Sequence, residues 1–437
     1  MGLCGKSPVF QPIGKRVKKH YKALRGTRDI LPDEAGRWQF VEETARSVFA
    51  RYGFREIRTP VFEATELFAR SVGEASDIVR KEMYTFERGD DSMTLRPENT
   101  ASVVRAFVEH SMFRNVASGY PERYYYIGPM FRHERPQKGR QRQFHQIGVE
   151  VLGSAEPLVD AETIQMVDVF LGELGIEERE LVIGSVGDET CRPGFKAALK
   201  QWLEPRLGEL CEDCRRRYEE NPLRVFDCKI EEDQRLLSGA PVVLEMLCGA
   251  CQEHFEEVRR ILDRYGIRYR VEPRLVRGLD YYERTVFEVL SDRLGSQNAI
   301  LGGGRYDGLV EELGGPPIPG LGFAMGIERM ILLLPERLGA TSGFDVALVS
   351  LGTEGAHAAV EMAQRLRGAR LRVISPVSER PMGAQLKRAN KLGARFAVFV
   401  GADEIAAGTY GVKNLLTGDQ VPMDEATIIA RCGENHE

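Results

Sequence analysis

The chain has 437 residues, 43% of them hydrophobic, and a formal net charge of −5. At about 100–200 residues per domain, this length predicts two to four domains, each able to bury a core. No apolar run reaches the roughly 18 residues of a membrane helix, and the N-terminus lacks the apolar core of a signal peptide, so we expect a cytoplasmic protein that does not cross a membrane.

A basic segment, Lys15–Arg25, stands near the N-terminus, and we predict a basic arm over residues 1–22. Such a run is typical of a solvated, flexible arm. The acidic total does not exclude RNA as a partner, because phosphate binding needs only local clusters of lysine and arginine.

The first regular element that the sequence predicts is a helix from about Glu34. Its apolar residues recur at helical spacing and are Trp38, Val41, Ala45, Val48 and Tyr52. Pro32 is a typical start and Gly53 a typical end for such a helix. A short strand over residues 54–59 should follow, and Pro60 restricts it to a sheet edge or a strand end.

A long antiparallel hairpin is predicted next. Its two arms and its basic tip are Tyr124–Arg132, Phe144–Leu152 and Arg135–Arg142. Because alternate side chains of a strand share a face, Gln146, Gly148 and Glu150 point the same way. The glycine leaves open space where a ligand could lie, although an ordinary half-exposed sheet has the same alternation.

Two further segments allow both a binding and a structural interpretation. Glu98 and Thr100 stand just before a predicted helix, Ala101–Met112, where capping of the helix start is the simpler explanation. Arg277, in the segment Arg277–Tyr282, lies in an apolar region, where a buried arginine needs an anion as its partner. A surface position on an edge strand explains Arg277 equally well.

Glycine-rich stretches occur at Leu301–Asp307 and Gly320–Arg329. Glycine permits close approach of the backbone, and we expect Arg329 on a helix that begins near Phe323. A plain turn is the simpler interpretation of such a loop.

These segments together contain three candidate anion-binding arginines, Arg132, Arg277 and Arg329, and two candidate pocket carboxylates, Glu98 and Glu150. No Ser/His/Asp arrangement accompanies them. The set suits phosphoryl-type chemistry that depends on positioning and electrostatics and not on a protein nucleophile.

Residues 190–268 are helical in pattern, charged and rich in cysteine, and we interpret them as an inserted domain. The sequence contains eight cysteines, and two pairs in this region have Cys-x2-Cys spacing, with Cys228 between them. That spacing is typical of tetrahedral zinc. The predicted ligands of one structural zinc are Cys211, Cys214, Cys248 and Cys251, with free buried thiols as the alternative.

The pattern of predicted elements changes again from Phe344. Short apolar strands (DVALVSL, RLRVISP and RFAVFVG) alternate there with helical segments. This alternation predicts a separate α/β domain over residues 344–437.

Several of these segments resemble class II aminoacyl-tRNA synthetases. Phe131–Glu134 is similar to motif 2, Gly326–Arg329 to motif 3, and the helix and strand that end at Pro60 to motif 1. The segments that resemble histidyl-tRNA synthetases in particular are Leu95–Glu98, Arg277–Tyr282 and Leu301–Asp307. The resemblance extends from about Ala23 to Val421.

The resemblance implies an α+β fold, with an antiparallel sheet flanked by helices, a helical insertion and a C-terminal α/β anticodon-binding domain. It implies a homodimer formed through motif 1. We therefore expect a basic arm at residues 1–22 and a catalytic core in two parts, at residues 23–189 and 269–340. Between the two parts we expect the insertion, at residues 190–268. The anticodon-binding domain should follow at residues 344–437.

The resemblance also implies roles for individual residues. The histidine-binding set is Glu98, Asn99, Thr100, Arg132, Gln146, Glu150, Arg277, Tyr281 and Tyr282. Within it Glu98, Thr100 and Gln146 would hold the α-amino group, and Glu150 and Tyr282 would face the imidazole. Arg132 and Arg277 would be catalytic, at the carboxylate and the α-phosphate. The ATP-binding set is Arg132, Glu134, Arg140, Phe144 and Arg329, with Mg²⁺ bridging the phosphates.

The activity that the resemblance implies is ligation of L-histidine to tRNA(His), driven by ATP. Asn99 stands where many relatives carry glycine. We expect the insertion to grip the tRNA acceptor stem and not to edit, because a polar pocket rejects unsuitable side chains by about 10⁴–10⁵ without editing. The alternative is a non-catalytic, synthetase-like regulatory subunit of histidine biosynthesis. Such paralogues tend to lack the anticodon domain and the pocket arginines, which this chain retains.

Overall fold

The computed structural model describes residues 21–73, 76–118, 120–137, 139–295, 298–336, 338, 343–376 and 380–433. Two compact units make up the chain, one containing Arg37–Leu338 and the other Gly339–Glu437. The predicted basic arm lies outside the described residues except for positions 21 and 22. In the described ranges, no helix combines the length and the apolar composition needed to span a bilayer.

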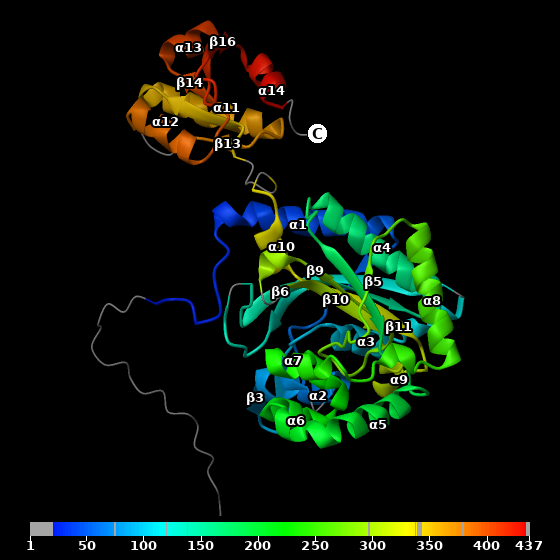
Figure 1. The fold of residues 1–437 in the computed structure, drawn as a ribbon. Coiled ribbons are helices and arrows are strands. Elements are labelled where there is room, and N and C mark those ends of the chain that lie inside the picture. The colour runs from blue at the N-terminus through cyan, green and yellow to red at the C-terminus, as the bar shows by residue number, and fades with distance from the viewer. Residues whose placement is uncertain are drawn as a thin grey trace, which may run out of the picture. The chain divides into compact units, whose positions relative to one another are not determined.

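An eight-stranded sheet forms the centre of the larger unit (Figure 1). Its strands in spatial order are β1 (Arg55–Glu56), β5 (Glu122–Phe131), β6 (Gln143–Leu152), β11 (Gly320–Gly326), β10 (Ala299–Arg305), β9 (Glu283–Leu290), β7 (Glu180–Ser185) and β8 (Arg270–Val271). Neighbours are antiparallel from β5 to β7, and the edge strands β1 and β8 pair in parallel. The predicted hairpin is confirmed as β5 and β6, in which Tyr126 pairs with Gly148.

The glycine-rich stretches are central strands of this sheet. We expected Leu301–Asp307 to be a turn and a helix to begin near Phe323, and both predictions are wrong. These residues lie largely in β10 and β11, and α10 (Ile327–Leu333) begins only where β11 ends. The reason is close packing, because a Cβ atom on Gly303 would overlap the backbone oxygen of Gly322 on the next strand.

One face of the sheet is covered by α1 (Pro32–Arg51), α4 (Pro157–Glu173), α8 (Gly249–Arg264) and α10, which share a hydrophobic core with β6, β9 and β11 (Figure 1). The predicted apolar stripe of α1 is confirmed, since Trp38, Val41, Ala45 and Val48 are buried. The strand that we predicted over residues 54–59 is shortened to β1, and it lies at the sheet edge, as Pro60 requires.

A buried charged cluster ties this core together. The Asp160 carboxylate of α4 lies 2.7 Å from the Arg305 guanidinium of β10 and 2.8 Å from His254 Nε2 of α8. Asp160 and Arg305 are fully buried. Although burial opposes it, the charge of Arg305 lowers the pKa of Asp160. The ion pair between Asp160 and Arg305 therefore fixes β10 against α4, and the contact of Asp160 with His254 adds α8.

The opposite face of the sheet packs against α3 (Thr100–Glu109) and α9 (Leu309–Glu312), with a core that includes Val103, Phe107 and Val286. Beside it lies a small sheet of β2 (Phe62–Ala64), β4 (Asp91–Leu95) and β3 (Tyr84–Arg88), with α2 (Thr65–Val72). Helix α3 is the helix that we predicted from Ala101, and it begins one residue earlier.

The inserted segment is helical, as predicted. It contains α5 (Arg192–Leu203), α6 (Glu212–Glu220) and α7 (Glu231–Leu237), joined by the 3-10 turns Glu204–Glu209, Pro222–Asp227 and Val243–Glu245. These elements have a small core of their own, which includes Phe195, Leu199 and Val225. Helix α8 lies within the predicted insertion, but it packs against α4 through Val258 and Leu262, in the core of the main sheet.

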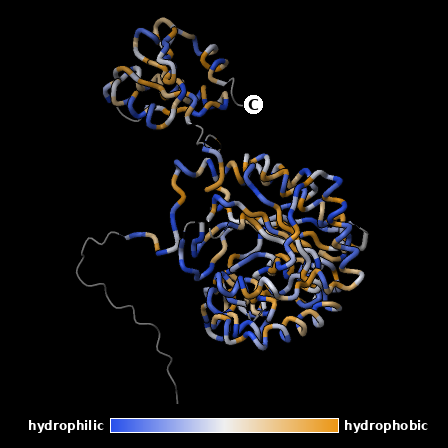
Figure 2. Tube along the Cα trace, in the orientation of Figure 1, coloured by the Kyte–Doolittle hydropathy of each residue, from blue (hydrophilic) through white to orange (hydrophobic). Residues whose placement is uncertain are grey.

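The smaller unit has the α/β arrangement that the sequence predicts. Its sheet has the order β13 (Val373–Ile374), β12 (Val346–Ser350), β14 (Phe396–Val400), β15 (Tyr410–Asn414) and β16 (Gln420–Met423). Its helices are α11 (Gly352–Gly368), α12 (Met382–Lys391), α13 (Ala402–Ala407) and α14 (Glu425–Gly433). The three predicted strands are β12, β13 and β14, which run parallel. Figure 2 shows hydrophobic segments gathered inside each unit.

Candidate active site

A cavity of about 350 Å³ opens on the sheet face that α1 does not cover. The alternation along β6 creates it, because Ile147 and Val149 point into the core with α1, and Gln146 faces the cavity. Most of the predicted site residues line this one cavity, namely Glu98, Thr100, Arg132, Glu134, Arg140, Phe144, Gln146, Arg277, Tyr281, Tyr282 and Arg329. The structure thus brings together residues as far apart in the sequence as Glu98 and Arg329.

Asn99 and Glu150 are the predicted residues that do not line the cavity. The Asn99 side-chain oxygen accepts hydrogen bonds from the Thr59 hydroxyl at 2.7 Å and from Arg96 Nη1 at 3.1 Å. The carboxamide oxygen of Asn99 is thus turned toward a buried arginine behind the wall, and the assignment of Asn99 to the histidine set stays a prediction.

Glu150 lies beneath the floor of the cavity. Its carboxyl group is fully buried and accepts hydrogen bonds from the Thr100 hydroxyl at 2.7 Å and from the Tyr306 hydroxyl. Burial raises the pKa of Glu150 to about 8, even though these two hydrogen bonds act in the opposite direction. Glu150 is connected to the cavity by its hydrogen bond with Thr100, whose side chain lines the cavity.

Glu98 and Gln146 are two acceptors in the cavity wall, of which the first has hydrogen-bond partners and the second has none in the described residues. The Glu98 carboxylate caps α3, accepting from the backbone nitrogens of Thr100 at 2.7 Å and Ala101 at 3.0 Å, so the predicted capping is confirmed. Burial raises the pKa of Glu98. Gln146 Oε1 is buried and accepts no hydrogen bond from the described residues. An unpaired buried acceptor is costly, so this atom needs a donor from a ligand.

Four arginines converge on the cavity. Burial, followed by the charge of Arg140, lowers the pKa of Arg329 to about 10, and Arg132 and Arg277 add to this effect. Arg277 forms an ion pair with Glu288, and Arg140 pairs with Glu134 at 2.6 Å. Such crowding of cations is stabilised by a polyanion, and guanidinium groups suit phosphate.

Aromatic rings close the two ends of the cavity. Tyr281 and Tyr282 are buried and lie with ring centroids 4.8 Å apart, and Tyr281 also contacts Tyr306 at 5.6 Å. At the other end the Arg132 guanidinium lies over the Phe144 ring at 5.4 Å. Burial raises the pKa of Tyr281 and Tyr282, so both hydroxyls stay protonated and can donate.

The glycines of the central strands make room for these groups. A Cβ atom on Gly302 would collide with the Arg277 guanidinium, and one on Gly148 would collide with the Tyr126 hydroxyl. At Gly322 it would collide with Glu150. Glycine at these positions is therefore a requirement of the cavity and not of a turn.

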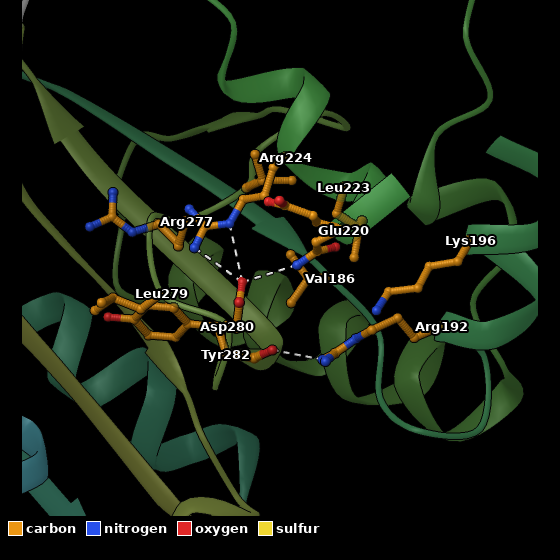
Figure 3. Close-up of a pocket in the computed structure, with 12 residues that line it drawn as sticks. Val186, Arg192, Lys196, Glu220, Leu223, Arg224, Arg277, Leu279, Asp280 and Tyr282 are labelled. Carbon is orange, nitrogen blue, oxygen red and sulfur yellow. Dashed lines mark hydrogen bonds and ion pairs between the residues drawn. The ribbon is translucent and has the colours of Figure 1, made fainter. Parts of the chain in front are cut away.

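The insertion supports the Arg277–Tyr282 segment from outside, around a second cavity of about 260 Å³ (Figure 3). Arg192 of α5 donates to the Tyr282 backbone oxygen at 2.7 Å. The Asp280 carboxylate accepts from Asn221 at 3.0 Å and from Arg224 at 3.1 Å. These contacts make the position of the segment depend on the insertion.

Several residues of the site were not identified from the sequence. They include Tyr126, Arg192, Lys229, Glu288 and Tyr306. Tyr126 could have been found, because it is directly opposite Gly148 in the hairpin register. Lys229 lines the cavity from the insertion, and no local pattern in the sequence marks it.

The cysteines do not form the single site that we predicted. Cys211 and Cys214 lie with Cys228 and Asp233, and a second group consists of Asp188, Cys191, Cys248 and Cys251. A site of Cys211, Cys214, Cys248 and Cys251 is thus a wrong prediction. The reason is that the first pair begins α6, in the core of the insertion, and the second pair begins α8, which packs on the main sheet.

An antiparallel sheet that carries an arginine-lined cavity on one face, joined in the same chain to a separate α/β unit, has the architecture of class II aminoacyl-tRNA synthetases. The sequence model described as "Histidyl-tRNA synthetase" matches residues 26–188 and 209–330, and that of the "Anticodon binding domain" matches residues 345–435. The chain belongs to the histidyl-tRNA synthetase family.

Individual relatives agree with this family. The histidine–tRNA ligase of Halothermothrix orenii is 49% identical over 412 residues, covering 93% of this chain and 98% of the relative. That of Anaeromyxobacter sp. (strain K) is 50% identical over 416 residues, with coverage of 93% and 98%. The crystal structure of apo S. aureus histidyl-tRNA synthetase matches with a TM-score of 0.79 and 37% identity, covering 94% of this chain and 99% of that chain.

Proposed function

We propose that the chain is a histidine–tRNA ligase. It activates L-histidine with ATP to histidyl-adenylate, releasing diphosphate, and then transfers the histidyl group to tRNA(His), releasing AMP. The observation that carries this proposal is the single cavity in which four arginines gather at one end and a buried acid lies under the other. The first end suits a triphosphate and the second suits a small polar side chain.

The amino acid fits the wall around Gln146. The cationic α-amino group would donate to Gln146 Oε1, which accepts nothing from the described residues, and to Glu98 and Thr100 beside it. The imidazole would lie toward Tyr281 and Tyr282. In this orientation its N–H points to the Thr100–Glu150 pair, and a tyrosine hydroxyl can donate to the other ring nitrogen.

The nucleotide fits the arginine end. Phe144 and Arg329 would hold adenine between them, which requires the Arg132 guanidinium to leave the Phe144 ring for the phosphates. Arg140 would meet the terminal phosphates. Mg²⁺ would be held mainly by those phosphates, and Glu134 and Glu288 are carboxylates in the cavity that offer the oxygen ligands that it prefers. When bound, the ion neutralises phosphate charge.

The chemistry of activation follows from the arginines. A carboxylate oxygen of histidine attacks the α-phosphorus, the bond from that phosphorus to the bridging oxygen breaks, and diphosphate leaves with the bond's electron pair. Negative charge grows on the α-phosphate oxygens in the transition state. Guanidinium groups of Arg132 and Arg277 that are already fixed there stabilise the transition state more than the ground state.

Transfer to tRNA is supported by basic residues of the insertion. Arg192, Lys196 and Arg224 line the second cavity next to Tyr282 (Figure 3). Lys229 lines the first cavity. We propose that the insertion, residues 190–268, binds the acceptor end of tRNA(His). In the second step a hydroxyl of the terminal ribose attacks the histidyl carbonyl, and AMP leaves.

We propose the remaining organisation from the family and the resemblance of the motifs. Residues 23–189 and 269–340 form the catalytic core, residues 344–437 bind the anticodon, and motif 1 forms a homodimer. The enzyme acts in the cytoplasm, where tRNA is charged. A regulatory subunit without catalysis is disfavoured because the chain keeps the four cavity arginines and the anticodon-binding unit.

Histidine-dependent exchange of diphosphate into ATP tests this proposal without tRNA. Arg277→Ala should reduce the exchange rate by about 10²–10³, because it removes a charge at the reacting phosphate. The matched control is Arg365→Ala, which removes an exposed arginine from the smaller unit, where it pairs with Glu425, and should leave the rate unchanged. Near-normal exchange in Arg277→Ala would refute its role.

A further inference from the structure

The cysteine-bearing region contains two groups of ligand atoms and not one. We infer that the chain binds two structural zinc ions, the first on Asp188, Cys191, Cys248 and Cys251 and the second on Cys211, Cys214, Cys228 and Asp233. In each group the four candidate ligand atoms all lie within 4.8 Å of one another. Each group offers three thiols and one carboxylate, a donor set that suits zinc.

The spacing of the first group matches a metal tetrahedron. At a zinc–sulfur distance of about 2.3 Å, two sulfurs of a tetrahedral site lie about 3.8 Å apart. The sulfurs of Cys191 and Cys251 are 3.9 Å apart, and the Asp188 carboxylate lies 3.6 Å from the Cys191 sulfur and 3.9 Å from that of Cys248. The two sulfurs are too far apart for a disulfide, which needs about 2.05 Å.

The second group repeats this geometry. The sulfurs of Cys211 and Cys228 are 3.9 Å apart, and the Asp233 carboxylate lies 3.1 Å from the Cys228 sulfur. Cys214, Cys228 and Asp233 are all at least nine-tenths buried. Two unrelated segments of the chain thus build the same set of donors at the same spacing, which is hard to explain by thiol packing alone.

Both groups start from a helix with the same local design. Cys211 is the N-cap of α6 and Cys248 is the N-cap of α8, and each is followed by a second cysteine three residues later. The Cys211 sulfur accepts a hydrogen bond from the Cys214 backbone nitrogen at 3.4 Å. A helix start favours negative charge, and a group of thiolates bound to a metal carries such charge.

The Asp188 carboxylate also accepts a hydrogen bond from the Thr190 backbone nitrogen at 3.0 Å and pairs with Arg284 at 3.4 Å, so its place beside the cysteines is fixed. Metal binding displaces the thiol protons, and the bound cation would then lie among three thiolates and one carboxylate.

The first site closes the base of the insertion. Asp188 and Cys191 follow β7, where the chain leaves the main sheet, and Cys248 and Cys251 begin α8, where it returns. The adjacent Arg192 donates to the Tyr282 backbone in the histidine pocket (Figure 3). A zinc ion there would hold both ends of the insertion and, through α5, the pocket wall. The second site would fasten α6 to α7 within the insertion.

Metal analysis of the purified full-length protein tests both sites. Inductively coupled plasma mass spectrometry, with native mass spectrometry for the intact chain, should give about two zinc ions per chain. Cys251→Ser and Cys228→Ser should each lower the ratio to about one, by emptying different sites. Cys432→Ser is the matched control, because this buried cysteine lies in the smaller unit outside both groups, and it should leave the ratio at two.

Other outcomes would overturn the inference. A wild-type protein that is free of metal, with all its thiols reactive after denaturation, would refute both sites. A metal-free protein with four fewer reactive thiols after denaturation would show that the cysteines form two disulfides instead. A single zinc ion that only Cys251→Ser removes would refute the second site. If a variant fails to fold, the number of zinc ions per wild-type chain still tests the inference. In addition, wild-type protein loaded with Co²⁺ in place of zinc should show the intense thiolate charge-transfer absorption of two sites.

Discussion

Replacement of Glu150 by glutamine removes the acid beneath the histidine pocket and leaves its shape almost unchanged. Glu150 is fully buried and accepts from Thr100 and Tyr306. In the proposed complex the imidazole N–H meets this pair. Glutamine still fills the space, but it carries no charge, and one of its two terminal groups is a donor that faces hydroxyl donors.

The exchange is compared at about pH 9, above the pKa of Glu150, where this acid is ionised. The expected loss then follows from the strength of one hydrogen bond to a charged group. Such a bond contributes about 1.5–3 kcal/mol, which corresponds to a factor of about 10–150 in affinity. We therefore expect the KM for histidine to rise by about 10- to 150-fold in Glu150→Gln. The KM for ATP should change by less than about threefold, because the arginine end of the cavity does not contact Glu150.

Diphosphate exchange measured over a range of histidine and ATP concentrations gives both KM values. Glu180→Gln is the control, because Glu180 lies on β7 of the same sheet, is exposed and pairs with Arg270. It should leave both values unchanged. Equal losses for histidine and ATP in Glu150→Gln would refute the assignment of Glu150 to the amino-acid end.

Three further predictions concern pH, space and stability. The raised pKa of Glu150 means that the folded protein holds this proton more tightly than the unfolded chain between about pH 4.5 and 8, so this group makes the free energy of unfolding fall as pH rises through that window. Urea unfolding at about pH 5 and pH 8 should show that the free energy of unfolding falls less between these two pH values in Glu150→Gln than in the wild-type protein. An equal fall in both proteins would contradict the raised pKa of Glu150. Gly302→Ala should drive the Arg277 guanidinium from its place and lower kcat for exchange with little change in the melting temperature; normal exchange would contradict that contact. Asp160→Asn should leave Arg305 buried without its carboxylate and destabilise the larger unit by about 3–5 kcal/mol, read from the urea midpoint, and a loss below about 1 kcal/mol would contradict the role of the pair.

The parts of the fold that could be predicted are those with a local period. The apolar stripe of α1 and the two arms of the β5–β6 hairpin follow from spacings of 3.6 and 2 residues, and the structure confirms both. The alternation in the hairpin also placed Gln146 on the face of β6 that lines the cavity. The strands of the smaller unit were found in the same way.

The parts that failed depend on contacts between distant segments. Gly302 and Gly322 favour a turn when they are considered locally, but in the sheet they make room for Arg277 and Glu150. Cys-x2-Cys spacing shows that a pair can bind metal and does not show which pair it joins. The contact of the Asn99 side-chain oxygen with Arg96 behind the wall is of the same kind, because no local pattern predicts it.

The most direct test of the account is diphosphate exchange by the wild-type protein with each of the twenty amino acids in turn. A cavity with four arginines at one end and a buried acid under the other predicts rapid exchange with histidine and rates at least about 10³-fold lower with every other amino acid. Comparable exchange with a second amino acid, or none with histidine, would contradict it.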